Sequence, residues 1–193
     1  MQWRYLCEDR VSDSFGLAAD EAMALRVGEN LSSPVLRLYT YHSSSALVGR
    51  FQRIENELNL EFCREQKMSV NRRPTGGGAI LMGEYQLGVA LMLRDWSGYK
   101  APRELMRHFA SSLCEGLLIF GIKSQFRGKN DLEVEGRKIG GLGIHSNASG
   151  GYLLHCSLLV DLDMPLMLRA LNVPVEKLEA RQLKNIEGRI TTV

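Results

Sequence analysis

Three strand-like segments follow one another near the C-terminal end of the chain, and they constrain the fold more than any other feature. They are residues 131–136 (DLEVEG), 137–146 (RKIGGLGIHS) and 151–162 (GYLLHCSLLVDL). Turn-forming residues separate them, at Glu135-Gly136 and at 147–151. Connections this short join antiparallel neighbours, so the pattern predicts an antiparallel sheet in this part of the chain.

The remaining elements mix strands with crossover helices. Pro102 and Gly121 bound one helical stretch, because proline is favoured at a helix start and glycine just after a helix end. Asn59 is placed to cap a short helix, and Asp13 or Ser14 an N-terminal one. The patterns predict helices at residues 13–29, 60–67, 103–120 and 164–172, and further strands at residues 35–41, 46–51, 68–73 and 88–94. We therefore expect a mixed α/β fold with a largely antiparallel sheet flanked by helices.

Composition narrows the class of protein. The chain has 193 residues, 45% of them hydrophobic, and a formal net charge of +2, which favours a single domain over residues 1–193. Basic residues form no run of the kind that binds nucleic acid, and the apolar runs are too short to cross a bilayer. We expect a soluble, cytoplasmic protein. Its four cysteines form no CxxC pair, so a zinc site is not predicted.

The first candidate site is the stretch RRPTGGGAI, residues 72–80. Without a Cβ, Gly76, Gly77 and Gly78 let a ligand lie against the main chain, where successive N–H groups can form an anion-binding nest. Arg72 and Arg73 supply guanidinium groups that suit a phosphate or a carboxylate. In an extended strand the two arginines point to opposite faces, so only one would face the ligand. The alternative reading is a flexible hairpin loop with surface arginines.

The second candidate site is GKNDLEVEGRKIGG, residues 128–141. Lys138 lies between a tight turn and the pair Gly140-Gly141, where its ammonium group can meet a carboxylate, a phosphate or a developing negative charge. Asn130 and Asp131 can orient a ligand, and Asp131 is a candidate ligand for a hydrated Mg²⁺. A solvated hairpin with an ordinary surface lysine is the alternative.

The third candidate is His155, inside the apolar segment GYLLHCSLLVDL. A single histidine in such a strand is more often a hydrogen-bonded core residue than a catalytic one. Side chains alternate between the two faces of a strand, so we expect Cys156 to point away from His155, and Arg137 away from Lys138.

These three motifs in this order resemble lipoate–protein ligase A and the wider superfamily of biotin and lipoate ligases and octanoyltransferases. The resemblance runs from LAADEAM through NRRPTGGGAIL, KNDLEVEGRKIGG and HCSLLVDLDM to GRITTV. It implies a fold like the catalytic core of biotin ligases and class II aminoacyl-tRNA synthetases. It also implies that ATP, with Mg²⁺, and lipoate form lipoyl-adenylate. The acyl group then passes to a lysine of an apo lipoyl domain in a 2-oxoacid dehydrogenase complex or of the glycine-cleavage H protein.

The resemblance also assigns roles to residues. The loop that wraps the lipoyl tail and the adenylate matches Arg72, Gly76, Gly77, Gly78 and Ala79. The lysine that contacts the acyl carbonyl and the phosphate matches Lys138, followed by Gly140 and Gly141. The pair near the nucleotide matches Asn130 and Asp131, and the histidine of the family's HG motif matches His155.

The sequence departs from the family pattern at several points. Leu81 and Met82 stand where members commonly have a histidine, and Cys156 follows His155 where they have glycine. Typical ligases continue into an accessory domain, whereas residues 1–193 are expected to form a single ligase-like catalytic domain with no C-terminal accessory domain. A separate accessory chain is therefore among the expected partners. Three functions stay open: an ATP-dependent lipoate–protein ligase, an octanoyl or lipoyl transferase that works through a cysteine thioester, and a non-catalytic protein that binds lipoyl or adenylate ligands. The segment before the lysine has no cysteine, which favours the ligase.

Overall fold

The computed structural model describes residues 2–94, 101–172 and 188–193. The strands are β1 (Arg4–Val11), β2 (Val35–Tyr41), β3 (Ser45–Val48), β4 (Ser69–Arg72), β5 (Ile80–Met82), β6 (Gln86–Arg94), β7 (Gln125–Arg127), β8 (Asp131–Val134), β9 (Arg137–Ser146) and β10 (Gly151–Leu159). The helices are α1 (Asp13–Gly28), α2 (Ile54–Glu57), α3 (Leu60–Glu65), α4 (Pro102–Ile119) and α5 (Met164–Ala170). No helix among these described residues is long and apolar enough to cross a membrane.

Two sheets organise the chain. The large sheet has seven strands in the order β1-β2-β6-β10-β9-β8-β7, and only the β1–β2 pair is parallel. The small sheet has the order β4-β3-β5, with β3 parallel to β4 and antiparallel to β5. The expected mixed, largely antiparallel sheet flanked by helices is confirmed.

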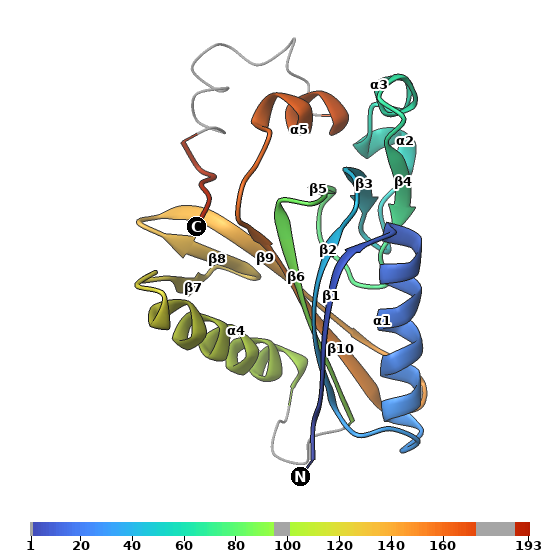
Figure 1. The fold of residues 1–193 in the computed structure, drawn as a ribbon, viewed down its shortest axis with the longest axis vertical. Helices are drawn as coiled ribbons and strands as arrows, with labels where there is room; N and C mark the ends of the chain where they lie inside the picture. The colour runs from blue at the N-terminus through green and yellow to red at the C-terminus, as the bar shows by residue number, and fades with distance from the viewer. Residues whose placement is uncertain (1, 95–100, 173–187) are drawn as a thin grey trace.

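Helices lie on both faces of the large sheet (Figure 1). On one face α1 packs over β2, β6 and β10, around a core that includes Val35, Tyr41 and Met92. On the other face α4 packs against β7 and β9, around a core that includes Phe109 and Leu154. A third core joins the small sheet to α3 and α5. The small sheet and α5 lie together at one end of the large sheet (Figure 1).

Asp13, the first residue of α1, anchors the small sheet. Its carboxylate accepts hydrogen bonds from the hydroxyl of Ser45, from Ser69 Oγ at 2.6 Å and from Asn71 Nδ2 at 2.7 Å. Burial alone would raise the pKa of Asp13, but these hydrogen bonds lower it below its ordinary value. The carboxylate thus stays charged and ties α1 to β3 and β4, from whose end the glycine-rich loop departs.

Most predicted elements are present, but the cap of α1 needs correction, and β1, β5, β7 and α2 were not predicted. The helix cap at Asn59 and the helix that starts at Pro102 are confirmed. The cap of α1 is Ser12, which accepts from the Phe15 amide, and the prediction of Asp13 or Ser14 was wrong because Asp13 is used by the small sheet. Strand β1 was not predicted, since it is an edge strand whose side chains are mostly exposed and carry no apolar alternation.

Candidate active site

A cavity of about 280 Å³ opens between the glycine-rich loop, β9, β10 and α5. This is near the lower end of the range of about 300–1,000 Å³ for small-molecule sites. One part is aliphatic, with Leu81, Leu142, Met167, Leu168 and Leu171 among its lining residues. Another part carries polar groups, namely those of Arg73, Asn130, Lys138, His155 and Ser157. Such a lining suits a ligand that has both an apolar tail and a charged end.

A β-bulge turns Lys138 into this cavity. Leu132 pairs with Gly140 and Glu133 pairs with Lys138, so Ile139 has no partner on β8. Ile139 is fully buried on the α4 side. A Cβ at Gly141 would instead lie 3.4 Å from Lys138 Nζ. A regular strand would place residues 138 and 140 on one face, but the bulge places 138 and 141 there.

Asp131 holds the ammonium group of Lys138. The distance from Lys138 Nζ to Asp131 Oδ1 is 2.6 Å, and both side chains are about one third exposed. Arg137 is exposed, with its guanidinium 4.0 Å from the Glu135 carboxylate, and it is not among the cavity's lining residues. The expectation that Lys138 and Arg137 point to opposite faces is therefore confirmed.

The glycine-rich loop folds around the buried side chain of Arg73. Its Nη2 donates to the carbonyl oxygens of Gly76 at 3.1 Å and Gly78 at 2.5 Å. In a trans peptide the N–H points opposite to the C=O, so the N–H groups of Gly77 and Ala79 point away from Arg73. Within the described residues these two N–H groups have no hydrogen-bond acceptor. The loop thus offers free backbone donors of the kind that bind anions.

Arg72 supports the loop from outside the cavity. Its Nη1 donates to the carbonyl oxygens of Gly49, Arg50 and Gln52 at 2.7–3.1 Å. The turn that it fixes lies against the glycines, because a Cβ at Gly49 would be only 2.1 Å from the Gly77 carbonyl oxygen. Of the two adjacent arginines, Arg73 is the one that lines the cavity.

His155 joins β10 to the start of the loop. Its Nε2 is 3.1 Å from the hydroxyl oxygen of Thr75, which is fully buried. Burial lowers the pKa of His155 to about 3, and the charge of Arg73 adds to this effect. The imidazole is therefore neutral at ordinary pH. Gly143 makes room for this contact, since a Cβ there would lie 2.8 Å from both His155 Nε2 and Thr75 Oγ1.

Asn130 ties the loop before β8 to β9. Its side-chain Nδ2 donates to the backbone carbonyl oxygen of Leu142 at 3.3 Å, and its backbone carbonyl oxygen accepts from the Leu142 amide at 2.7 Å. Asp131 is directed to Lys138, and in the described residues no cluster of three His, Cys, Asp or Glu side chains could hold a metal ion. A Mg²⁺ ion at Asp131 would therefore depend on one carboxylate that already binds a lysine.

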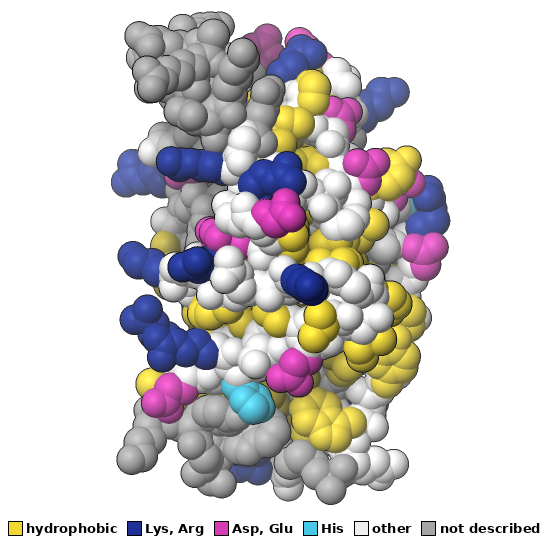
Figure 2. Space-filling view, turned by 90° about the vertical axis from the view of Figure 1, so that its left-hand side faces the viewer, with side chains coloured by type: hydrophobic (Ala, Val, Ile, Leu, Met, Phe, Trp, Pro, Cys, Tyr) yellow, Lys and Arg dark blue, Asp and Glu magenta, His cyan; other side chains and the backbone are white. Residues whose placement is uncertain are grey.

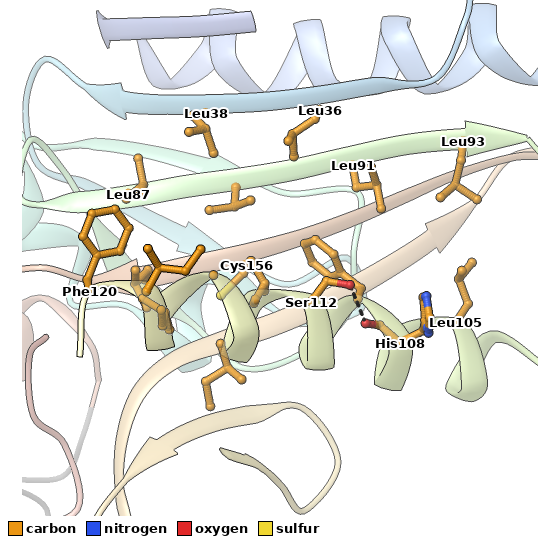
Figure 3. A pocket seen from close by; sticks show the side chains of 18 of the residues that line it. Leu36, Leu38, Leu87, Leu91, Leu93, Leu105, His108, Ser112, Phe120 and Cys156 are labelled. Atoms are coloured by element: carbon orange, nitrogen blue, oxygen red, sulfur yellow. Dashed lines mark hydrogen bonds between the residues drawn. The ribbon is translucent and has the colours of Figure 1, made fainter. Parts of the chain in front are cut away.

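A larger cavity of about 600 Å³ lies on the other face of the large sheet. Leu36, Leu38 and Leu91 of β2 and β6 point toward α4 there, and His108 and Ser112 lie on the helix (Figure 3). Viewed from the side of α4, the surface shows hydrophobic side chains gathered over one part of this face and basic side chains along its margin (Figure 2). Because its lining is almost entirely apolar, this cavity lacks convergent groups for acyl or phosphoryl chemistry.

Cys156 belongs to the larger cavity, on the face opposite His155. It is 1% exposed, and burial raises the pKa of its thiol to about 12. Cys63 is also buried, Cys114 is half-buried and Cys7 is exposed, and none of the four cysteines of the chain lines the smaller cavity. A reactive thiolate is therefore not part of the candidate active site.

The structure brings together most of the residues singled out in the sequence. Those that line the smaller cavity are Gly76, Gly78, Ala79, Asn130, Lys138, Gly140, Gly141 and His155. Arg72, Gly77 and Asp131 lie beside it. Among the lining residues, sequence analysis missed Ser157, Ile190 and the α5 side chains. It also missed Thr75, the partner of His155. Thr75 stands inside the RRPTGGG motif, but nothing in the local sequence signals the pairing of Thr75 with His155, 80 positions later.

Comparison with known proteins identifies the family. Residues 13–193 match the family model described as lipoyl protein ligase A/B catalytic domain. An octanoyltransferase LipM of Lysinibacillus sphaericus is 27% identical over an alignment 218 residues long, which covers 99% of this chain and 78% of that protein. A probable lipoate-protein ligase A of Mycoplasma pneumoniae is 30% identical over 154 residues, or 79% of this chain and 44% of that protein.

Solved structures share the fold. A lipoate-protein ligase A bound with ATP superposes with a TM-score of 0.84 at 23% identity, over 100% of this chain and 76% of that one. A bi-partite lipoate protein ligase from Thermoplasma acidophilum, described together with its E2 lipoyl domain, gives a TM-score of 0.83 at 23% identity, over 100% and 75% of the two chains.

Proposed function

The chain is an enzyme of the lipoyl protein ligase A/B catalytic domain family, and from this premise we propose that it is an ATP-dependent lipoate–protein ligase. Lipoate, activated as lipoyl-adenylate, would occupy the smaller cavity, and the acyl group would pass to a lysine of an apo lipoyl domain. The aliphatic wall formed with α5 suits the lipoyl tail, and Lys138 and the glycine-rich loop suit the adenylate phosphate.

One observation carries the choice of a ligase. Lys138 lines the smaller cavity and no cysteine does. Transfer between carrier proteins through a thioester needs a thiolate beside the acyl group. A mixed anhydride with AMP is already activated, so its transfer to an amine needs no nucleophile from the enzyme, only positioning and charge stabilisation.

In the proposed mechanism the lipoate carboxylate attacks the α-phosphorus of ATP, and pyrophosphate leaves. The acceptor amine then attacks the acyl carbonyl carbon, an amide bond forms, and AMP departs. The ammonium group of Lys138 would stabilise the negative charge that develops on the carbonyl oxygen and on the phosphate. Asp131 orients this group, because its carboxylate binds Lys138 Nζ at 2.6 Å. A Mg²⁺ ion held by Asp131 would share this one carboxylate with the Lys138 ammonium group.

A second candidate function is octanoyl transfer from one carrier protein to another. The observation in its favour is that relatives aligned over 99% of the chain are octanoyltransferases. In this reading Cys156, which follows His155 in the sequence, would have to become the acyl carrier. Cys156 faces the wrong side of the sheet for the smaller cavity.

The two functions separate in one assay. The protein is incubated with an apo lipoyl domain and either lipoate with Mg-ATP or an octanoyl carrier protein, and the acceptor mass is measured. The ligase proposal expects a lipoyl mass shift that depends on ATP. An octanoyl shift without ATP would favour the transferase, and acyl-adenylate binding without any mass shift would favour a non-catalytic binding protein.

The same assay tests Lys138. Removing a well-placed group that stabilises an oxyanion typically costs roughly 10²–10³ in rate, so we expect a loss of about that size in Lys138→Ala. Arg137→Ala is the matched control, since the neighbouring side chain points away from the cavity. Circular dichroism checks that both variants fold. Equal losses in the two variants would contradict the assignment.

A further inference from the structure

The last residues of the chain pair with the backbone of Lys138. The Lys138 amide donates to the Arg189 carbonyl oxygen at 2.7 Å, and the Thr191 amide donates to the Lys138 carbonyl oxygen at 2.8 Å. These bonds place Ile190 directly beside Lys138 in a parallel bridge. Two hydrogen bonds thus fix both polar backbone groups of this residue on one side.

This pairing continues the sheet where β10 stops. Within β9, Gly140 is the last residue paired to β10, opposite Leu158, and β10 ends one residue later. The Val193 amide donates to the Leu159 carbonyl at 3.0 Å, so the terminal segment meets the end of β10. Without the segment, the edge of β9 at Lys138 would have no partner on that side.

Lys138 also stands where the opposite side of β9 is least regular. The bulge interrupts the β8–β9 ladder between Glu133 and Leu132, and the turn at Glu135 and Gly136 follows, with φ of 51° and 76°. A bulge weakens the ladder locally, so the pairing with β8 alone determines the peptide orientation at Lys138 poorly. The terminal segment supplies the missing constraint.

The backbone orientation decides where the lysine side chain points. The Cβ direction sets the path of the four-carbon side chain toward Asp131 and the cavity. Rotation of the peptide at Lys138 would therefore displace Nζ from its contact with Asp131. Ile190 in addition lines the cavity next to Lys138. The segment therefore contributes both to the direction of the ammonium group and to the wall of the cavity.

We propose that residues 189–191 form a backbone clamp that positions Lys138 for acyl transfer. The role of Lys138 rests on the function proposed above, whereas the clamp itself can be measured separately. Its members are positioning residues, because they act through Lys138 and not on the ligand's reacting atoms.

Two adjacent threonines provide a matched test. Replacing the backbone N–H of Thr191 by an ester oxygen, through the α-hydroxy analogue of threonine, removes one clamp bond and leaves the side chain in place. The same replacement at Thr192 is the control, since in the described residues its N–H has no hydrogen-bond acceptor. Misplacement of a catalytic group by about 1 Å can cost 10²-fold, so we expect acyl transfer to fall roughly 10- to 100-fold with the Thr191 ester and to be unchanged with the Thr192 ester.

Hydrogen exchange measures the clamp without reference to activity. The Lys138 amide should exchange faster in the Thr191 ester protein than in the wild type or the Thr192 ester protein. Faster exchange with an unchanged turnover number would overturn the positioning role, and unchanged exchange would overturn the clamp.

A double-mutant cycle separates positioning from general stability. In a Lys138→Ala background the Thr191 ester should cause no further loss of rate, because the group that it positions is gone. An equal further loss would show a merely structural effect. If the wild-type protein transfers no acyl group, the proposed function fails. The clamp is then judged by binding of a non-reactive acyl-sulfamoyl adenosine, which the Thr191 ester should weaken and the Thr192 ester should not.

Discussion

Acidification should destabilise the protein through His155. Its imidazole is buried against Thr75 and Arg73, and burial lowers its pKa from 6.5 to about 3. In the unfolded chain the same group regains a pKa near 6.5. Below pH 6.5 the unfolded state therefore binds a proton that the native state does not bind until about pH 3. The contribution to stability is fully present above pH 6.5 and is lost as the pH falls toward 3.

The size of the effect follows from the two pKa values. One pKa unit corresponds to about 1.36 kcal/mol, so at about pH 4.5, two units below 6.5, the loss is about 2.7 kcal/mol. The whole interval down to about pH 3 corresponds to roughly 5 kcal/mol. These values are large against a typical free energy of unfolding of about 5–15 kcal/mol.

The measurement compares the wild type with His155→Gln, whose amide can still hydrogen bond Thr75 but does not titrate. Denaturant unfolding is followed between about pH 7.5 and 4.5, and the difference between the two proteins is plotted against pH. Burial raises the pKa of Asp20 to about 6, so protonation of Asp20 stabilises the native state over part of the same pH range. Asp20 is present in both proteins, so its contribution cancels in the difference. We expect the wild type to lose about 2.7 kcal/mol more than the variant. Parallel curves would refute a buried neutral imidazole.

Three further substitutions test the site. Gly76→Val should abolish binding of lipoyl-adenylate with little change in melting temperature, because a Cβ there meets no atom within 4 Å and the residue lines the cavity. Gly77→Val is a poorer probe, because it should also lose about 1–3 kcal/mol of stability: Gly77 has a φ of +102°, and a Cβ there would lie 2.9 Å from Arg73 Nη2. Equal melting temperatures of Gly77→Val and the wild type would contradict this. Cys156→Ser should keep most acyl transfer while losing about 1–3 kcal/mol of stability from a poorly satisfied buried hydroxyl, and a trapped thioester on Cys156 would instead support the transferase.

Local patterns in the sequence predicted the elements that local forces determine. The helix Pro102–Ile119, which Gly121 follows, and the hairpin at Glu135-Gly136 are present because proline, glycine and positive φ act within a few residues. Strand β1 escaped detection because an edge strand buries few side chains. The cap of α1 shifted to Ser12 because Asp13 binds three side chains of the small sheet, a tertiary contact that no local pattern contains.

In the candidate site, too, local patterns predicted some features, and tertiary contacts determined the others. Strict alternation along a strand correctly separated Lys138 from Arg137 and His155 from Cys156. It could not identify which arginine of the pair lines the cavity, since that depends on how the loop wraps around a buried guanidinium.

The bulge explains why alternation works on one side of Lys138 and fails on the other. Counting by twos from Lys138 places Gly140 on its face, yet Gly141 is the glycine beside its ammonium group. A pair of adjacent glycines tolerates either arrangement, so the sequence leaves the register undetermined. The register is set by two partners, β8 across the tight hairpin on one side and residues 189–191, which are distant along the chain, on the other. The position of the lysine thus depends on β8, β9 and residues 189–191 together, and loosening the backbone pairing of β8 or of residues 189–191 should move the ammonium group even where the side chains that line the cavity are unchanged.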